Sequence, residues 1–153
     1  MKAQADLNIR FDEGAPKDRF TITNFGACDI GPTSISIDLS GSTFGLVFDV
    51  TAKGAGVEVF QPFEVTIGRE NLSKIPMVKD GDNIIKLDLT GLKSKESFAF
   101  TIDVDDTKKS REITVSNSEL QGAKVVAKDQ KQTISAPFQE NASATLELSS
   151  CGA

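Results

Sequence analysis

Residues 98–104 read FAFTIDV, a run in which apolar side chains alternate with small or polar ones. Successive side chains of an extended strand point to opposite faces, so Phe98, Phe100, Ile102 and Val104 share one face. The run therefore predicts a strand with one apolar side. Such a strand must cover that side against a second layer, which makes it part of a packed sheet.

The same alternation recurs on both sides of this run, and Gly, Pro, Asn and Asp interrupt it at short intervals. We expect further strands at residues 7–11, 20–22, 35–39, 46–50, 57–59, 63–67, 85–89, 113–115, around 125, 134–138 and 144–148. Helical turns fit only at 70–75 and 118–121, and both stretches are short. The chain is predicted to be all-β, with about ten strands in a two-sheet antiparallel β-sandwich.

Composition places the chain among globular domains without a nucleic-acid partner. Its 153 residues suit one domain, and 10 Phe with no Trp or Tyr make phenylalanine the expected large core residue. The net charge is −5, without a run of Lys or Arg, whereas phosphate binding needs clustered basic residues. No apolar stretch approaches the roughly 20 residues of a transmembrane helix, so no membrane span is expected.

The N-terminus suggests a compartment. Ala3-Gln4-Ala5 has the small-x-small form of a signal-peptidase site. Residues 1–5 are therefore interpreted as a signal-peptide remnant or expression tail, and residues 6–153 as a single β-sandwich domain. This interpretation predicts a secreted protein that is extracellular, attached to the cell surface or periplasmic. Chance occurrence of such a triplet is the alternative.

The chain has two cysteines, Cys28 and Cys151. An even pair in a secreted chain predicts a disulfide, which would clamp the last strand onto an early loop. In the chain-entropy model a bond that closes so long a loop stabilises by about 4–5 kcal/mol. Two buried free thiols are the alternative. A zinc site is not expected, since there is no third cysteine and no histidine.

The sequence offers no set of residues for catalysis, so we do not expect an enzyme. The absence of histidine removes the usual general base and the base of Ser-His and Cys-His pairs. No nucleophile elbow, P-loop or dinucleotide fingerprint occurs. A pair of carboxylates could serve a glycosidase, but among 22 acidic residues any single pair is weak support.

Acidic residues gather where two strands end. Asp103 and Asp105 lie on the face opposite the apolar one, and Asp106 follows in the turn, while Asp12 and Glu13 follow the first strand. Calcium binds several carboxylate and carbonyl oxygens, and loops of extracellular sandwiches often supply them. These five residues are the predicted calcium ligands. The alternative is a set of solvated turn residues whose charge the basic residues at 108, 109 and 111 balance.

Five stretches taken together resemble a known family. They are RFDEGAPKDRF at 10–20, GLVFD at 45–49, GVEVFQPF at 56–63, FTIDVDDT at 100–107 and REITVS at 111–116. They are similar to small secreted bacterial relatives of the sponge aggregation factor core protein. In sponges, core subunits of this type form the ring of a particle that mediates calcium-dependent cell adhesion. The resemblance implies a self-associating extracellular β domain with a calcium dependence.

Two functions follow from these observations. The first is a structural or adhesion module that forms homo-oligomers through sheet edges or an apolar patch, and that contacts a cell-surface glycan or protein. The second is an extracellular carbohydrate-binding module, which would share the sandwich and the acidic loops. Sugar rings commonly stack on exposed Trp or Tyr, and the chain has neither. The adhesion function is therefore favoured.

Overall fold

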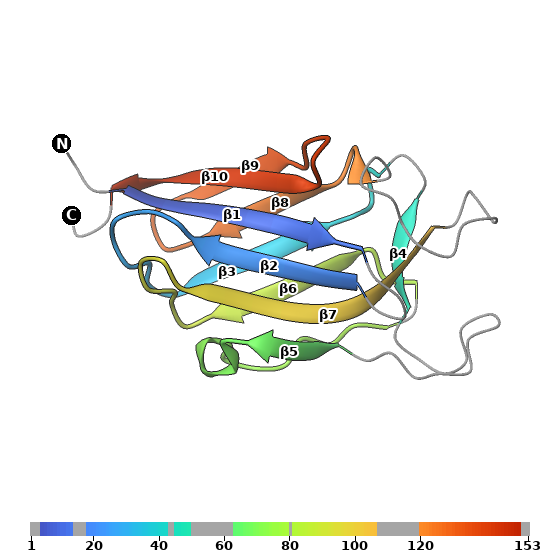
Figure 1. Ribbon diagram of the computed structural model, residues 1–153, viewed down its shortest axis with the longest axis horizontal. Helices are drawn as coiled ribbons and strands as arrows, with labels where there is room; N and C mark the ends of the chain where they lie inside the picture. The colour runs from blue at the N-terminus through green and yellow to red at the C-terminus, as the bar shows by residue number, and fades with distance from the viewer. Residues whose placement is uncertain are drawn as a thin grey trace.

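The computed structural model describes residues 4–13, 18–42, 45–49, 63–79, 81–106 and 120–150. These residues form two antiparallel sheets and a short 3-10 helix, η1 (Arg69–Asn71) (Figure 1). The strands are β1 (Gln4–Asp12), β2 (Asp18–Asn24), β3 (Thr33–Asp38), β4 (Leu46–Asp49), β5 (Glu64–Ile67), β6 (Ile84–Leu89), β7 (Ser97–Asp106), β8 (Lys124–Lys128), β9 (Thr133–Pro137) and β10 (Ser143–Ser150). The predicted all-β sandwich of about ten strands is confirmed.

The larger sheet has six strands in the order β10-β1-β2-β7-β4, and β5 also pairs with β7. One edge of β7 pairs with β2 over Ser97 to Ile102. The other edge pairs first with β5, up to Thr101, and then with β4, from Asp103 onward. The run FAFTIDV therefore lies in the strand that pairs with three others of this sheet.

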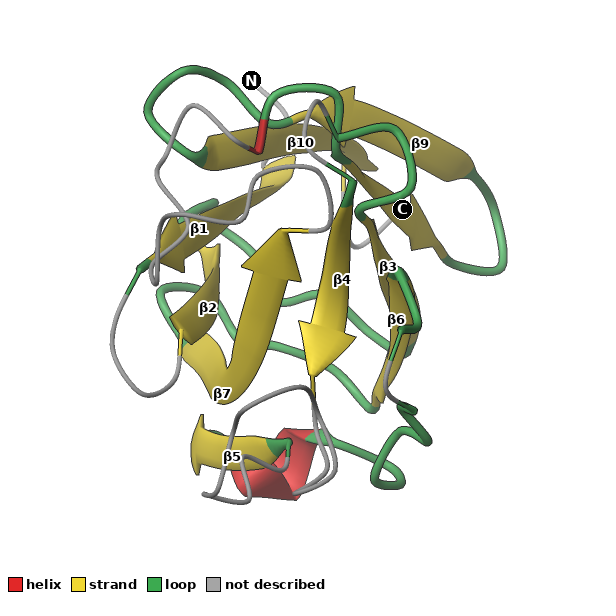
Figure 2. Cartoon of the chain, turned by 90° about the vertical axis from the view of Figure 1, so that its right-hand side faces the viewer, coloured by secondary structure: helices red, strands yellow, loops and turns green. Residues whose placement is uncertain are grey.

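The smaller sheet has four strands in the order β6-β3-β8-β9, so β3 and β8 are its inner strands. It stacks behind the larger sheet, as Figures 1 and 2 show. β4 connects the two layers at one end. The Phe48 N–H donates to the carbonyl oxygen of Asp82 (2.8 Å), and the Gly81 N–H donates to the carbonyl oxygen of Phe48 (2.9 Å), just before β6 begins.

The core lies between the sheets and is built from the alternating apolar residues. Phenylalanine dominates the side of the larger sheet, where the rings of Phe20 and Phe100 stack with centroids 5.3 Å apart and Phe11 lies 5.1 Å from Phe20. Isoleucine, leucine and valine dominate the facing side, as at Ile35, Ile37 and Leu87. The expectation that phenylalanine supplies the large core residues is confirmed for most described phenylalanines, but Phe25 is 42% exposed.

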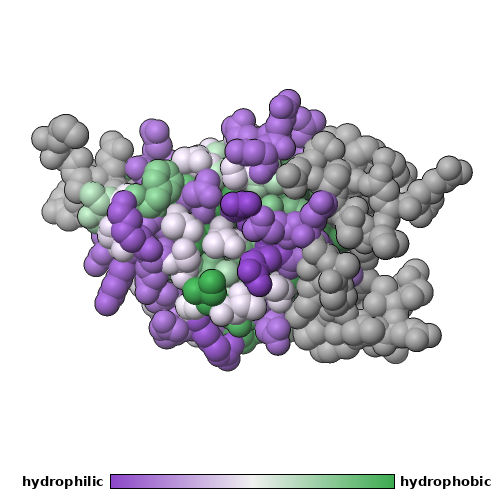
Figure 3. All heavy atoms as spheres, viewed as in Figure 1, coloured by the Kyte–Doolittle hydropathy of each residue, from purple (hydrophilic) through white to green (hydrophobic). Residues whose placement is uncertain are grey.

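The outer face of the larger sheet is mostly hydrophilic or neutral where described, with isolated hydrophobic side chains (Figure 3). In the strand expected at 63–67, alternation would place Ile67 on the same face as Phe63 and Val65, which pack against the core. A register shift between Val65 and Ile67 in the β5–β7 pairing interrupts the alternation, and Ile67 is 49% exposed. That expectation was therefore wrong.

Several other expectations concern the boundaries of elements. The helical turn expected at 70–75 is present only at its start, because η1 covers Arg69–Asn71. The strands expected at 57–59 and 113–115 lie outside the described residues. β1 begins at Gln4, so it includes two residues that were assigned to the leader remnant. Among the described residues, no helix is both long and apolar enough to span a bilayer.

Candidate functional site

The outer face of the four-stranded sheet carries the candidate site. Alternation on β3 buries Ile35 and Ile37 and turns Ser34, Ser36 and Asp38 outward. The register then places three rows of outward side chains across the sheet, which are Asp88, Ser34, Lys128 and Thr133, then Lys86, Ser36, Val126 and Ser135, and then Ile84, Asp38, Lys124 and Pro137.

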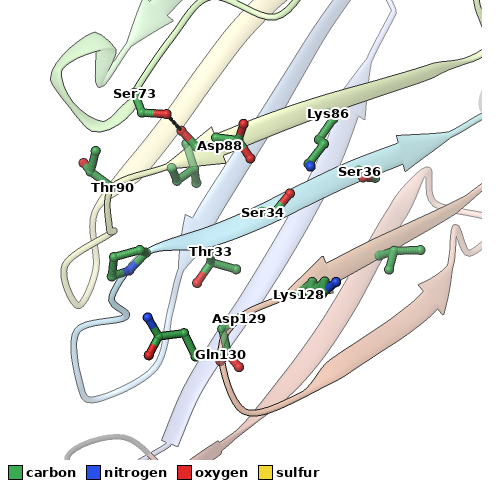
Figure 4. Close-up of a pocket in the computed structure, with 13 residues that line it drawn as sticks. Thr33, Ser34, Ser36, Ser73, Lys86, Asp88, Thr90, Lys128, Asp129 and Gln130 are labelled. Carbon is green, nitrogen blue, oxygen red and sulfur yellow. Dashed lines mark hydrogen bonds between the residues drawn. The ribbon is translucent and has the colours of Figure 1, made fainter.

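The rows explain why this face is hollowed. The central strand contributes small serine side chains, whereas β6 and β8 contribute the long side chains of Lys86 and Lys128 on either side. An open groove with a volume of about 690 Å³ results. Figure 4 shows Ser34 and Ser36 along its floor, with Lys86 pointing from β6 toward β3 and Lys128 on the opposite side.

Loop residues complete one end of the groove. Ser73 donates through both its backbone N–H and its hydroxyl to the carbonyl oxygen of Asp88, at 2.9 Å in each case, which fixes the segment after η1 beside β6. On the other side, Asp129 and Gln130 begin the turn from β8 to β9 and line the groove. Pro32 lies at the same end, just before β3.

The carboxylate of Asp129 is used by its own turn. One of its oxygens accepts hydrogen bonds from the N–H groups of Lys131 (2.7 Å) and Gln132 (2.9 Å). Burial acts to raise the pKa of Asp129, but these backbone hydrogen bonds and the nearby charge of Lys131 outweigh it and hold the pKa below its ordinary value of 3.8. Asp129 is therefore a structural anion at neutral pH.

Other groups of the groove remain available to a ligand. In the part of the chain that the structure describes, the side chains of Ser34, Ser36, Lys86, Lys128 and the carboxylate of Asp88 make no hydrogen bond or ion pair. Pro32, Leu89 and Val126 add apolar surface. The groove thus offers hydroxyl, ammonium and carboxylate groups beside hydrocarbon, and none of the described residues that line it is aromatic.

The predicted calcium ligands are only partly brought together. Ile102 and Val104 are buried, so Asp103 faces outward as expected. Asp12 is on β1 opposite Arg19 of β2, and Arg19 is opposite Thr101 of β7. Asp12 and Asp103 are therefore two strand spacings apart and offset by two residues, about 12 Å in all. In addition, Asp12 accepts a hydrogen bond from Arg10 at 3.0 Å.

The structure describes the backbone of Asp105 and Asp106 in β7, but their side chains lie outside what it describes. Glu13 is exposed just after β1. Among the described residues no group of three or more acidic, cysteine or histidine side chains could hold a metal ion. Sequence reasoning missed Asp49, which β4 places directly opposite Asp103, because the order of strands decides that neighbour.

The structure describes one of the two predicted disulfide partners, Cys28. Cys28 is half-buried, packs against the core and is not a free thiol. Cys151 lies outside the described residues, so its pairing with Cys28 stays a prediction.

The groove itself was also missed by sequence reasoning. The signal was present in Ser34-Ile35-Ser36, where small polar residues alternate with buried ones, but the lysines beside them come from distant positions in the chain.

No protein-family model and no curated protein matches this chain. Among solved structures, it is similar to an inactive mutant of the GH20 exo-β-N-acetylglucosaminidase from Vibrio harveyi, at 14% sequence identity and a TM-score of 0.36. The match covers 84% of this chain, which spans only 17% of the length of that one. A likeness of this strength carries no argument about function.

Proposed function

We propose that this chain is a non-catalytic binding module of an extracellular or cell-surface protein, and that its groove binds a glycan. The observation that carries the proposal is the groove on the outer face of the four-stranded sheet, whose serine hydroxyls and flanking ammonium and carboxylate groups have no partner within the described chain. A rigid sheet holds all of them in a fixed arrangement.

The chemistry of the lining suits a sugar. A glycan presents hydroxyl groups that both donate and accept, together with apolar C–H surface, and the groove offers counterparts for each. Because the described lining contains no aromatic ring, we expect hydrogen bonds to supply most of the affinity. We expect weak binding, with a Kd on the order of 1 mM for a short oligosaccharide, or about −4 kcal/mol.

The test is an NMR titration of the labelled protein with neutral, N-acetylated and acidic oligosaccharides. Binding should shift amide signals of β3, β6 and β8. Ser36→Leu fills the floor of the groove and should abolish the shifts, whereas Thr21→Leu, on the outer face of the other sheet, should preserve them. Absence of binding by every oligosaccharide, or binding that survives Ser36→Leu, would refute the proposal.

A second function, self-association in adhesion, is favoured by a different observation. Ile75, Met77 and Ile84 are exposed by 47%, 92% and 49%. The segment carrying Ile75 and Met77 is fastened to β6 at Asp88 and to the turn before β6 at Asp82, so it runs beside that strand. We call these three residues the β6 apolar strip. Exposed apolar surface of this kind is common at protein interfaces.

The family resemblance also supports self-association. Light scattering at increasing concentration should then detect an oligomer, and Met77→Lys should weaken it because a charge would enter the contact. Lys79→Ala, just beyond the strip, serves as the control. A monomer at every concentration, with and without calcium, would remove this function and leave glycan binding.

A further inference from the structure

We infer that the ligand of the groove is an acidic glycan, whose carboxylate or sulfate groups are bound by Lys86 and Lys128. This inference rests on the proposed function and specifies its ligand class. Lys86 lies opposite Ser36 on one side of β3, and Lys128 lies opposite Ser34 on the other side. Both therefore stand over the same strand of hydroxyl groups.

The size of the groove, together with the spacing of the two lysines, indicates an extended ligand. They are two strands apart, about 10 Å across the sheet, and are offset by two residues along β3. Both long lysine side chains could contact one small anion, but such an anion would fill little of the groove of about 690 Å³. A chain that lies diagonally across β3 could place successive anionic groups at the two lysines and its hydroxyls over Ser34 and Ser36.

Lysine ammonium groups without a described partner on this face also favour an anion, although Asp38, Asp88 and Asp129 equal the three lysines in number. The whole chain has a net charge of −5, yet Lys86, Lys124 and Lys128 all project from this face without an ion pair in the described residues. Two carboxylates of the face are used locally. Asp38 accepts hydrogen bonds from the Ser40 N–H and hydroxyl, and Asp129 accepts those of its turn.

Asp88 distinguishes an acidic glycan from a denser polyanion. Its carboxylate lies opposite Ser34 and is available as an acceptor in the described chain. A ligand made entirely of closely spaced phosphates would be repelled by Asp88 and would have no donor for it. A sugar that carries acidic groups between free hydroxyls can donate to Asp88 while its anions contact the lysines. The face therefore supplies ammonium groups for the anions of such a sugar and a carboxylate for its hydroxyls.

The experiment compares four probes by calorimetry and NMR. They are an oligogalacturonate, its methyl ester, a sulfated oligosaccharide and a neutral oligosaccharide of the same length. The acidic probes should bind about tenfold or more tightly than the ester and the neutral probe, and should weaken as NaCl rises from about 0.05 M to about 0.5 M. The stronger of the two acidic probes identifies the anionic group.

Variants assign the effect to the two lysines. Lys86→Gln with Lys128→Gln should reduce acidic binding about tenfold and leave neutral binding unchanged, whereas Lys93→Gln, exposed elsewhere on the surface, should change neither. If neutral and acidic probes bind equally, or if the double variant has no effect, the inference is wrong while glycan binding stands. If no probe binds, or if Ser36→Leu leaves binding intact, the proposed function itself fails.

Discussion

Gly41 and Gly122 lie backbone against backbone, although 80 residues separate them in the chain. A Cβ on Gly41 would stand 2.6 Å from the carbonyl oxygen of Gly122, and a Cβ on Gly122 would be even closer to the carbonyl oxygen of Gly41. Gly122 also has a φ of +94°. This contact joins the turn after β3 to the turn before β8, which frame one end of the smaller sheet.

Gly122→Ala should therefore destabilise the protein by about 2 kcal/mol or more, since it adds both a backbone clash and a left-handed alanine. Urea unfolding measures the effect. Gly31→Ala is the matched control, because a Cβ there meets nothing within 4 Å, and it should stay within about 0.5 kcal/mol of the parent. Equal stability of the two variants would show that the glycine contact is not as described.

Asn24 is predicted to stabilise the end of the larger sheet at which β2 ends and β7 begins. Its fully buried amide donates to the carbonyl oxygens of Cys28 (2.9 Å) and Leu92 (3.0 Å) and accepts from the Gly26 N–H (3.1 Å). Asn24→Ala leaves these groups unsatisfied and should cost about 2–4 kcal/mol. Asn8→Ala, which loses one exposed 3.4 Å hydrogen bond, should cost less than about 0.5 kcal/mol. Chemical denaturation of both variants tests this difference.

The fold could be predicted because alternation in this chain is rarely broken. Each run such as 98–104 fixes which side chains face the core, and turn residues bound the runs. Ile67 shows where that reasoning fails. A bulge shifts the side chains after it to the other face, and its position depends on the pairing of β5 with β7 rather than on β5 alone.

The sites were harder to predict because sheet order creates them. Alternation correctly turned Asp103 away from the core, but only the order of strands shows that Arg19 on β2 separates it from Asp12 and that Asp49 lies opposite it. The groove has the same origin. Ser34, Lys86 and Lys128 are neighbours through the register of three strands from distant parts of the sequence.

The lowered pKa of Asp129 predicts a dependence of stability on pH. A carboxyl whose pKa is lower in the folded state stabilises the protein above the pKa of the unfolded chain, about 3.8. That contribution is lost as pH falls through the folded pKa. Asp129→Asn should therefore be less stable than the parent at pH 7, and the difference should narrow below about pH 4. Urea unfolding at several pH values measures it.

Glu140→Gln is the control for this measurement, since Glu140 is exposed and makes no hydrogen bond in the described residues. It removes the same charge without changing the β8–β9 turn. A pH profile of Asp129→Asn that runs parallel to the parent would contradict a stabilising role of the Asp129 carboxylate.

The calcium site stays a prediction, and the β4–β7 register adds Asp49 to the residues that it would involve. Asp49 and Asp103 occupy directly opposed positions of β4 and β7, and like charges in such positions repel. A cation bound there would relieve the repulsion, so millimolar calcium should raise the Tm relative to chelator. Asp103→Asn with Asp105→Asn should remove the increase. Equal melting temperatures in calcium and chelator for the parent would exclude the site.

Cys28 and Cys151 are predicted to form a disulfide, because the segments next to them meet at one end of the larger sheet. Gln4 at the start of β1 pairs with Ser150 at the end of β10, directly before Cys151. The same end of β1 contacts the turn after β2, where the Phe25 N–H donates to the carbonyl oxygen of Asp6 at 3.0 Å, three residues before Cys28. A bond between the two cysteines would thus join segments that already lie at one end of the sheet.

Such a bond closes a loop of roughly 120 residues and should stabilise by about 2–5 kcal/mol. We expect the denatured, unreduced protein to resist alkylation, to keep the mass of a single chain and to lose stability on reduction. Cys28→Ala with Cys151→Ala should be as unstable as the reduced parent and should not respond to reductant. Two alkylated cysteines without reductant would refute the disulfide, and a mass of two chains that reduction halves would assign the bond to two copies instead.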